Sequence, residues 1–423
     1  MRNDTFSVLA AATQRPRLLC VLGKSPVPDN TGSRRRILRL IQAAHNDFEI
    51  HMLVVVSRPL PRDDADALEN LELGTHRVLQ VPGARSFKSR DQLGAGLPRS
   101  WRKVDLTLAK RMIADEVQRF DPGIVWVASP LLFAACVPDG IYDRKGRPIP
   151  VVIDVAHTEK RAIDSQLKSD FRNLIARPRN LRRMALLASD RAASIRTERR
   201  AFTMATMLTV CSAVEASIAI RHAAGDVVVV PNGIDLPPNT GRTAGGHGIL
   251  FVGNFGYRPN AEAAEYLAKR ILPQVRISHP DAQVRLVGPG AGAVNRLNDI
   301  PGIEIVGFLP EIDQAYANAE VVVAPIFSGS GTKTKILEAM SYGIPVVTTS
   351  EGVAGLAVER GRHLFASNSE EDLIGYTRRI FDDPVEADRM SENALTWVRE
   401  SHIWYPIGQE FSSKLLGLHE DLR

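Results

Sequence analysis

Short apolar runs alternate with amphipathic segments through the second half of the chain. The apolar runs cover residues 249–252, 284–287, 303–306, 321–325 and 345–349, and they are rich in Val and Ile. Between them, residues 261–277, 313–319 and 334–342 place apolar side chains at helical spacing. Regular alternation of strands and helices predicts a parallel, doubly wound sheet.

The first half repeats this alternation. Its apolar runs cover residues 18–22, 50–56, 124–128, 151–153, 208–211 and 227–230, and a long helical region extends from about 159 to 200. The chain is therefore predicted to be α/β, with two Rossmann-like doubly wound parallel-sheet domains that face each other across a central cleft. Ligands of such sheets bind at the carboxyl ends of the strands, so the loops after the strands are where chemistry is expected.

Domain boundaries follow from length and from one Pro-rich and Gly-rich segment. A chain of 423 residues is too long for a single hydrophobic core. Residues 236–246 concentrate Pro, Gly and Thr between two apolar runs, which is typical of a linker. We predict a first domain over 1–236, a linker over 237–247, a second domain over 248–400, and a C-terminal helix in 401–423 that packs back toward the first domain.

Composition narrows the class of protein. Each of the three cysteines, Cys20, Cys136 and Cys211, lies within an apolar run, without the spacing of a metal site or a disulfide framework. This indicates buried thiols in a reducing compartment. No apolar run reaches the roughly 18–20 residues that a membrane span needs. We expect a cytoplasmic protein.

Charge is distributed unevenly along the chain. Residues 1–236 contain 36 Lys and Arg against 25 Asp and Glu, whereas residues 237–423 contain 17 against 23. The first half is therefore expected to face an anionic partner. Residues 177–200 collect arginines with few aromatic side chains, so a stacking platform for bases is missing and a nucleic acid is not expected. A solvated basic helix face and anionic lipid headgroups stay open as explanations.

One candidate loop follows the first apolar run. Residues 23–34 end in Gly32 and Ser33, where a helix begins. Gly32 would let the backbone approach a ligand, and the N–H groups at the helix start could receive a phosphate or a sugar oxygen. The alternative is a plain strand-to-helix turn that contains a glycine.

The most informative segment is residues 325–347. A strand enters a Gly-rich turn that includes Gly331, Thr332 can cap the next helix, and Lys333 and Lys335 add positive charge where the N–H groups converge. Such a site suits a diphosphate. Glu338 shares a helix face with Lys335 and could accept hydrogen bonds from ribose hydroxyls. The alternative is a capped helix with one Lys–Glu surface pair.

Several motifs in order resemble the retaining glycosyltransferases of family 4, which have the GT-B fold. They lie at residues 231–235 (Pro-Asn-Gly-Ile-Asp), 251–254, 307–309, 329–335, 337–340 (Leu-Glu-Ala-Met) and 343–347. The resemblance covers nearly the whole chain. It implies transfer of a sugar, with retention of configuration, from a nucleotide-diphosphate sugar bound by the second domain. It also implies that the base lies near Phe308 and Leu309.

Two positions depart from the common family pattern. The family has a pair of Glu eight residues apart; Glu338 matches the second, but the first falls on Ser330. Many members carry Arg where this chain has Asn254, with Arg258 nearby. The sequence resembles the branch that reads Gly-Ser-Gly-Thr-basic-x-Lys-x-Leu-Glu-Ala-Met. We expect Lys333 and Lys335 to supply the positive charge, with Asn254 beside the diphosphate.

A third segment, residues 152–160, ends a strand of the first domain. Family members commonly place an Asp or a His in this loop near the transferred sugar. His157 comes three residues after Asp154, rather than two as in the common pattern. We predict a catalytic role for His157, against the alternative of a core or capping histidine.

The expected activity is transfer of a sugar to a hydroxyl of a glycan or lipid-linked acceptor in the synthesis of a surface polysaccharide or glycoconjugate. No metal or other cofactor is expected, because the Asp-x-Asp spelling at Asp64 and Asp66 lies in a polar helical segment. A nucleotide-sugar isomerase or epimerase and a non-catalytic nucleotide-sugar-binding subunit stay open as alternatives. A dinucleotide-dependent oxidoreductase lacks its glycine fingerprint after the first strand.

Basic and apolar residues mix between positions 85 and 103. The basic ones are Arg85, Lys88, Arg90, Arg99, Arg102 and Lys103, and the apolar ones are Phe87, Leu93, Leu97 and Trp101. This mixture suits an anionic membrane surface, so we predict peripheral attachment to the cytoplasmic membrane face. The alternative is a solvated loop.

Overall fold

Two parallel sheets organise the chain. In the computed structural model, which describes residues 15–81, 105–137, 140–172, 180–238, 241, 248–329 and 333–421, the first sheet has seven strands in the order β3-β2-β1-β4-β5-β6-β7. The second, over the same described residues, has six in the order β10-β9-β8-β11-β12-β13. Neighbouring strands pair in parallel in both sheets. The predicted α/β class with two doubly wound parallel sheets is confirmed.

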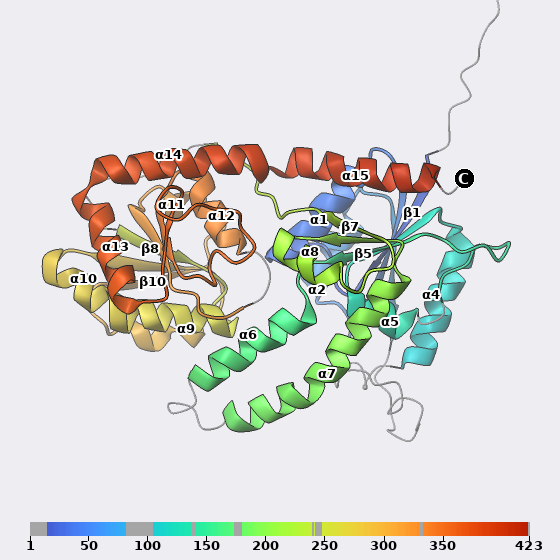
Figure 1. Ribbon diagram of the computed structural model, residues 1–423, viewed down its shortest axis with the longest axis horizontal. Helices are drawn as coiled ribbons and strands as arrows, with labels where there is room; N and C mark the ends of the chain where they lie inside the picture. Colours follow the sequence, from blue (N-terminus) through green and yellow to red (C-terminus); the bar gives the residue numbers. More distant parts are fainter. Residues whose placement is uncertain are drawn as a thin grey trace, which may run out of the picture.

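The first sheet and its helices extend over most of the first half of the chain (Figure 1). The strands are β1 (Arg17–Leu22), β2 (Glu49–Val56), β3 (Thr75–Gln80), β4 (Ile124–Val127), β5 (Val151–Val155), β6 (Met207–Val210) and β7 (Asp226–Val229). The helices are α1 (Gly32–Ala44), α2 (Arg62–Glu69), α4 (Leu106–Phe120), α5 (Pro130–Cys136), α6 (Glu159–Arg172), α7 (Asn180–Met204) and α8 (Ala213–Ala219). The helical region predicted over about 159–200 is thus two helices, α6 and α7, which pack together.

The second sheet begins at residue 248. Its strands are β8 (Gly248–Val252), β9 (Gln283–Val287), β10 (Ile303–Gly307), β11 (Val321–Ala324), β12 (Val346–Thr348) and β13 (Phe365–Ala366). The α-helices that follow are α9 (Arg258–Tyr266), α10 (Leu272–Ser278), α11 (Asp313–Tyr316), α12 (Thr334–Ser341), α13 (Glu370–Asp382), α14 (Pro384–Ser401) and α15 (Trp404–Glu420). A π-helical turn over Leu267–Ile271 joins α9 to α10.

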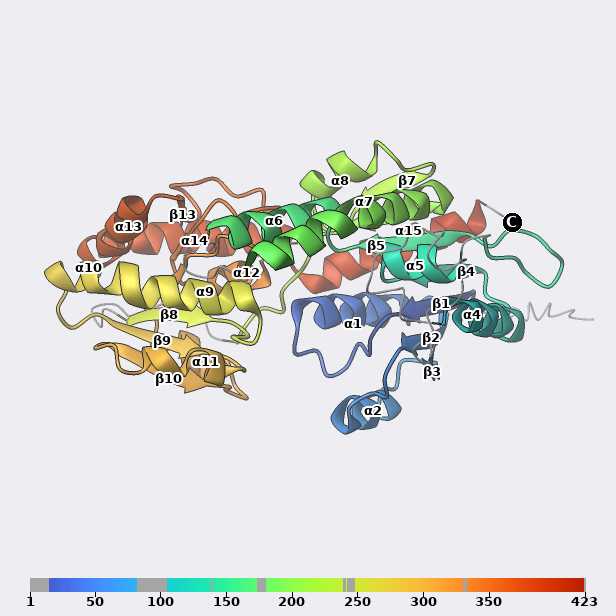
Figure 2. The same cartoon turned by 90° about the horizontal axis from the view of Figure 1, so that it is seen from below.

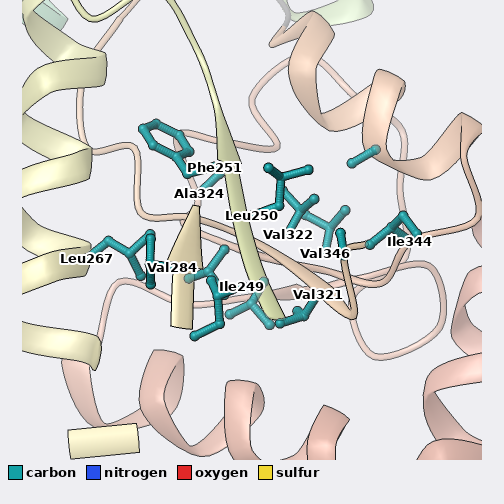
Figure 3. Close-up of a cluster of buried hydrophobic side chains, with 14 of the residues drawn as sticks. Ile249, Leu250, Phe251, Leu267, Val284, Val321, Val322, Ala324, Ile344 and Val346 are labelled. Atoms are coloured by element: carbon teal, nitrogen blue, oxygen red, sulfur yellow. The ribbon is translucent and has the colours of Figure 1, made fainter. Parts of the chain in front are cut away.

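Burial on both faces explains why the strands read as continuous apolar runs. Along β1, Leu19 and Val21 enter one apolar cluster and Leu18, Cys20 and Leu22 enter another, because successive side chains point to opposite faces. The second sheet is surrounded by a single large cluster, part of which is drawn in Figure 3. Each such side chain contributes about 1.5–3 kcal/mol through its burial.

A buried ion pair fixes α1 to the first sheet. Two nitrogens of the Arg36 guanidinium donate to the two carboxylate oxygens of Asp154 on β5, at 2.9 and 2.7 Å. Thr209 on β6 donates to the same carboxylate, and Arg36 also donates to the Val230 carbonyl and to Asn232. The carboxylate and guanidinium therefore satisfy each other without water, as a buried pair requires.

The end of the chain crosses from the second domain to the first. Helix α14 lies along the second domain and α15 along the first, on one side of the molecule (Figure 1). Ile234 N–H donates to the His402 carbonyl at 2.7 Å, at the junction between α14 and α15. Helix α15 then packs on α1, where a Cβ on Gly408 would come within 2.5 Å of the Ala43 Cβ. A larger residue at position 408 would push the two helices apart.

Helix α6 also reaches the second domain. Ser165 Oγ accepts from Gly329 N–H at 2.8 Å, and Ser169 donates to Glu262 on α9. Asp170 pairs with Arg258, also on α9. Figure 2 shows α6 extending from the first domain toward α9. These contacts hold the two sheets in one arrangement. Across the described helices, none combines the length and the apolar composition needed to cross a bilayer.

Candidate functional site

The strand order reverses at one point in each sheet, and the candidate residues gather there. In the first sheet the reversal lies between β1 and β4, and in the second it lies between β8 and β11. Loops that leave adjacent strands at such a point open a crevice for ligands. The loops after β1 and β4 contain residues 23–31 and 128–129; among the described residues, 253–257 follow β8, and 325–329 and 333 follow β11.

Helix α12 begins at Thr334, where the sequence pattern predicted a helix. Lys333 stands in the N-cap position with extended backbone, and its own side chain makes no capping hydrogen bond. The sequence offered Thr332 as a candidate cap, and the structure has Lys333 at the N-cap position. Ser330, Gly331 and Thr332 lie outside the described residues. The first N–H groups of a helix have no acceptor within the helix, and together with the helix dipole they favour an anion at this end.

Lys335 is a buried ammonium. Its Nζ donates to Asn260 Oδ1 at 2.5 Å and lies 4.8 Å from the centre of the Phe251 ring. A Cβ on Gly253 would come within 2.9 Å of this Nζ, so the glycine leaves the room that the ammonium occupies. Among the described carboxylates, none lies within 4 Å of Lys335. Burial, with Lys333 adding to it, lowers the pKa of Lys335 to about 7.

Lys333 differs from Lys335 in having a carboxylate neighbour. Its Nζ lies 3.4 Å from Glu351 Oε1, and its side chain is 10% exposed. Burial lowers the pKa of Lys333, while the Glu351 carboxylate opposes that shift. The two lysines thus place two cations at the start of one helix. Among the described carboxylates, Glu351 lies within 4 Å of Lys333, and none lies within 4 Å of Lys335.

Glu338 is engaged on both carboxylate oxygens. Tyr316 donates to its Oε2 at 3.2 Å, and the guanidinium of Arg35 from α1 lies 3.7 Å from its Oε1. Tyr316 stacks on Tyr342, with ring centres 4.1 Å apart. Burial raises the pKa of Glu338, and Arg35 opposes this. The alternative of a Lys–Glu surface pair was wrong, because Glu338 is paired across the cleft with Arg35 rather than with Lys335.

Asn254 shapes the loop after β8. Its Oδ1 accepts from Gly256 N–H at 2.8 Å, and its carbonyl accepts from Asn260, the residue that also holds Lys335. Arg258 is turned elsewhere, because it pairs with Asp170 and Glu262. The Asn254 carbonyl therefore holds the Asn260 side chain, which in turn accepts from Lys335. Arg258 instead takes part in the contact with α6.

Phe308 and Leu309 follow β10, at the edge of the second sheet. Phe308 is 66% exposed, whereas Leu309 packs partly buried against the core. In the sheet, β9 and β8 lie between β10, which these two residues follow, and β11, which leads to the lysines. The exposed ring is open to stacking by a planar ligand.

The start of α1 faces the start of α12. A Cβ on Gly32 would lie 3.2 Å from Thr334 Oγ1, so two helix N-termini meet across the cleft. Thr31 caps α1 by accepting from Arg34 N–H. Ser33 Oγ accepts from Lys24 Nζ at 2.8 Å. Burial lowers the pKa of Lys24, and the positive charge of Arg34 lowers it further. The structure thus brings Gly32 and Ser33 to the same cleft as the lysines of α12.

A cavity of about 600 Å³ opens beside this point in the first domain. Its wall includes Lys24, Ser33, Arg58 and His157, together with apolar side chains such as Val55 and Leu132. Burial lowers the pKa of His157, with Glu215 opposing, so the imidazole is neutral at pH 7. His157 is thus a wall residue of a cleft-facing cavity, whereas its neighbour Asp154 is held by Arg36.

Sequence reasoning missed four residues of this site: Lys24, Arg35, Asn260 and Glu351. The run of arginines at positions 34–36 was a visible signal for Arg35, and Lys24 lay within the first candidate loop. Asn260 and Glu351 had no local signal, because each meets a lysine that is distant in the chain. Among the described residues, no group of three or more His, Cys, Asp or Glu side chains is arranged to hold a metal ion.

Comparison with known proteins agrees with this architecture. Residues 246–383 match the family model of the group 1 glycosyl transferases. A curated protein of Klebsiella pneumoniae, described as an uncharacterized 44.6 kDa protein in the cps region, is 23% identical over 167 residues. That match spans 36% of this chain and 42% of the curated relative, which is less than half its length.

Solved structures resemble most of the chain. Sucrose-phosphate synthase from Thermosynechococcus elongatus superposes with a TM-score of 0.72 at 17% identity, over 96% of this chain and 100% of that one. HepE from Anabaena, solved with UDP-glucose, superposes with a TM-score of 0.60 at 16% identity, over 95% of this chain and 99% of that one. WaaG, a glycosyltransferase involved in lipopolysaccharide biosynthesis, superposes with a TM-score of 0.58 at 14% identity, over 93% of this chain and 98% of that one. The protein therefore has the GT-B fold, and its second domain carries the group 1 glycosyl transferase signature.

Proposed function

We propose that this protein is a retaining glycosyltransferase that moves a sugar from a nucleotide-diphosphate sugar to an acceptor hydroxyl. The observation that carries the proposal is Lys335, a buried ammonium with an amide oxygen and a ring face as its neighbours. An ammonium in such a place is costly unless an anion completes its surroundings. A diphosphate at the start of α12 would do so, with Lys333 beside it.

The reaction breaks the bond between C1 of the sugar and the diphosphate oxygen, and forms a bond from C1 to the acceptor oxygen, whose proton is released. Negative charge grows on the leaving diphosphate. Lys333, Lys335 and the N–H groups of α12 stabilise that charge without a metal ion, because they are already oriented in a partly dry site. Glu338 accepts from the ribose hydroxyls in place of Arg35.

The acceptor belongs in the cavity of the first domain. Its mixed wall, with cations at Lys24 and Arg58 and apolar groups at Val55 and Leu132, suits a glycan or lipid-linked acceptor. Neutral His157 can hydrogen-bond a hydroxyl there and receive or relay its proton. Loss of the imidazole in His157→Ala should lower turnover strongly while leaving donor binding intact; a subunit that merely binds nucleotide sugars would be indifferent to this change.

Peripheral attachment to the cytoplasmic face of a membrane is part of the proposal. The basic and apolar residues at positions 85–103 that suggest it lie outside the described residues. Cosedimentation with anionic and neutral vesicles across a salt series tests the attachment, because an electrostatic contact weakens as salt rises. Equal partitioning to both kinds of vesicle would remove the membrane claim and leave the transferase proposal standing.

The decisive experiment screens nucleotide sugars for thermal stabilisation and then follows turnover. UDP and UDP-glucose are the first probes, because HepE, which shares the fold, was solved with UDP-glucose. A donor that binds the native state raises its melting temperature. Incubation with the donor and a set of glycan and lipid-linked acceptors, read by NMR, then reports the anomeric configuration of the product. Sugar turnover without any acceptor would instead favour an isomerase or epimerase.

A further inference from the structure

A second carboxylate lies at the Lys333 end of the lysine pair. Glu351 follows β12, and its Oε1 is 3.4 Å from Lys333 Nζ. Its side chain is 27% exposed, so it is neither locked in the core nor fully solvated. Glu338 lies inside α12, beyond Lys335, whereas Lys333 stands at the N-cap of the helix and meets Glu351. The four groups therefore stand in the order carboxylate, ammonium, ammonium, carboxylate.

The loop that carries Glu351 is anchored to the sheet. Thr349 donates through its hydroxyl to the Ile326 carbonyl and accepts from Gly352 N–H at 3.1 Å. A Cβ on Gly352 would come within 1.9 Å of Thr348 Oγ1, so the chain folds directly onto the end of β12. Both threonines are buried. The backbone on either side of Glu351 is thus fixed, and the carboxylate is held at a defined place.

The Lys333 end of this row faces α6 of the first domain. Gly329, in the loop before Lys333, donates its N–H to Ser165 Oγ of α6 at 2.8 Å. Helix α6 begins at Glu159, directly after the loop that contains His157. A group attached to the diphosphate beyond Lys333 therefore lies between Glu351 and the cavity that contains His157.

We propose that Glu351 binds hydroxyls of the transferred sugar and so selects the donor. The proposal rests on the function proposed above. The row of four groups matches the order ribose, phosphate, phosphate, sugar, with Glu351 at the sugar. With Oε1 directed at Lys333, the carboxylate has its second oxygen for a sugar hydroxyl.

The test separates sugar binding from diphosphate binding. The most stabilising donor from a panel of UDP, GDP, ADP and dTDP sugars is chosen, and calorimetric titration compares it with its own nucleoside diphosphate and with analogues that lack one sugar hydroxyl. The variants are Glu351→Gln and Glu351→Asp. Glu359→Gln is the matched control, because Glu359 is exposed and pairs with Arg362.

In Glu351→Gln we expect the affinity for the nucleoside diphosphate to stay within about threefold of the original protein. The preference for the nucleotide sugar over that diphosphate should fall at least fivefold, and at least one deoxy analogue should bind as well as the full donor. Glu351→Asp should keep part of the preference, and Glu359→Gln all of it.

An unchanged preference in both Glu351 variants would overturn the proposal. So would a loss of diphosphate affinity with the preference intact, because Glu351 would then act only as the counter-ion of Lys333. If no nucleotide sugar binds the original protein at all, the proposed transferase function itself fails. That outcome differs from a donor whose binding is unchanged in the Glu351 variants.

Discussion

Helices α1 and α12 each follow a strand at the point where the strand order of its sheet reverses, yet their cations have different surroundings. Arg36 of α1 is neutralised by Asp154 in a buried, bidentate ion pair. Lys335 of α12 is buried against Asn260 and Phe251. The first half of the chain has the excess of positive charge, but the cation best placed for a diphosphate is in the acidic half. Total charge therefore does not locate an anion site; the partners of each cation do.

The largest expected effect comes from the paired cation. Arg36→Met leaves the Asp154 carboxylate buried without its partner, which typically costs about 3–5 kcal/mol of folding free energy. Urea unfolding of this variant should show a loss of that order. Arg39→Met removes an ion pair with Asp235 that is part-exposed, and should cost about 1 kcal/mol or less. Equal losses in the two variants would contradict the structural role given to Arg36.

The next effect concerns the cation that lacks a carboxylate partner. Lys335→Met should weaken binding of the nucleotide sugar by roughly 10-fold to 100-fold, because a charge-assisted hydrogen bond contributes about 1.5–3 kcal/mol. The unfolding free energy should be unchanged or higher, since a buried ammonium is removed. Calorimetric titration and thermal melts of one preparation give both numbers. Lys269→Met, on the surface of the same domain, is the control; a variant of Lys335 that unfolds while binding normally would reverse the comparison.

A pH series sharpens the same point. The free site has a Lys335 pKa of about 7, set mainly by burial, and a bound diphosphate would raise it because it favours the ammonium. Binding therefore takes up a proton, and donor affinity should fall as pH rises from 7 to 8.5, by at most about tenfold per pH unit. A nucleotide sugar is the right ligand, because its diphosphate does not titrate in this range. In Lys335→Met, the donor affinity should no longer depend on pH over this range.

The smallest effect tests a buried carboxyl of the first domain. Glu198 accepts from Glu159 N–H at 2.7 Å, and burial raises its pKa to about 8. The unfolded chain releases this proton near pH 4.5, so stability declines as pH rises from there to about 8. Glu198→Gln keeps the acceptor oxygen and does not ionise. Its melting temperature should exceed that of the original protein by about 1–3 °C at pH 8, and by less at pH 5.

Much of the fold was present in local patterns of the sequence. Apolar runs of three to seven residues between helical segments predicted both parallel sheets, because strands buried on two faces need continuous apolar residues. The helix at residues 334–341 was also recognised, since helix signals act over a few residues. Its predicted start at Thr334 agrees with the structure, and its end at Ser341 lies one residue before the predicted end.

The partners of the charged side chains were decided by the tertiary structure. Three consecutive arginines, Arg34, Arg35 and Arg36, reach Asp64, Glu338 and Asp154 respectively, at sequence separations from 30 to 303 residues. Nothing local distinguishes these three guanidinium groups. Desolvation and pairing depend on which strands and helices converge at a point, so the sequence determined the sheets and the cationic turn, while packing between distant segments decided which cations are paired and which are available to a ligand.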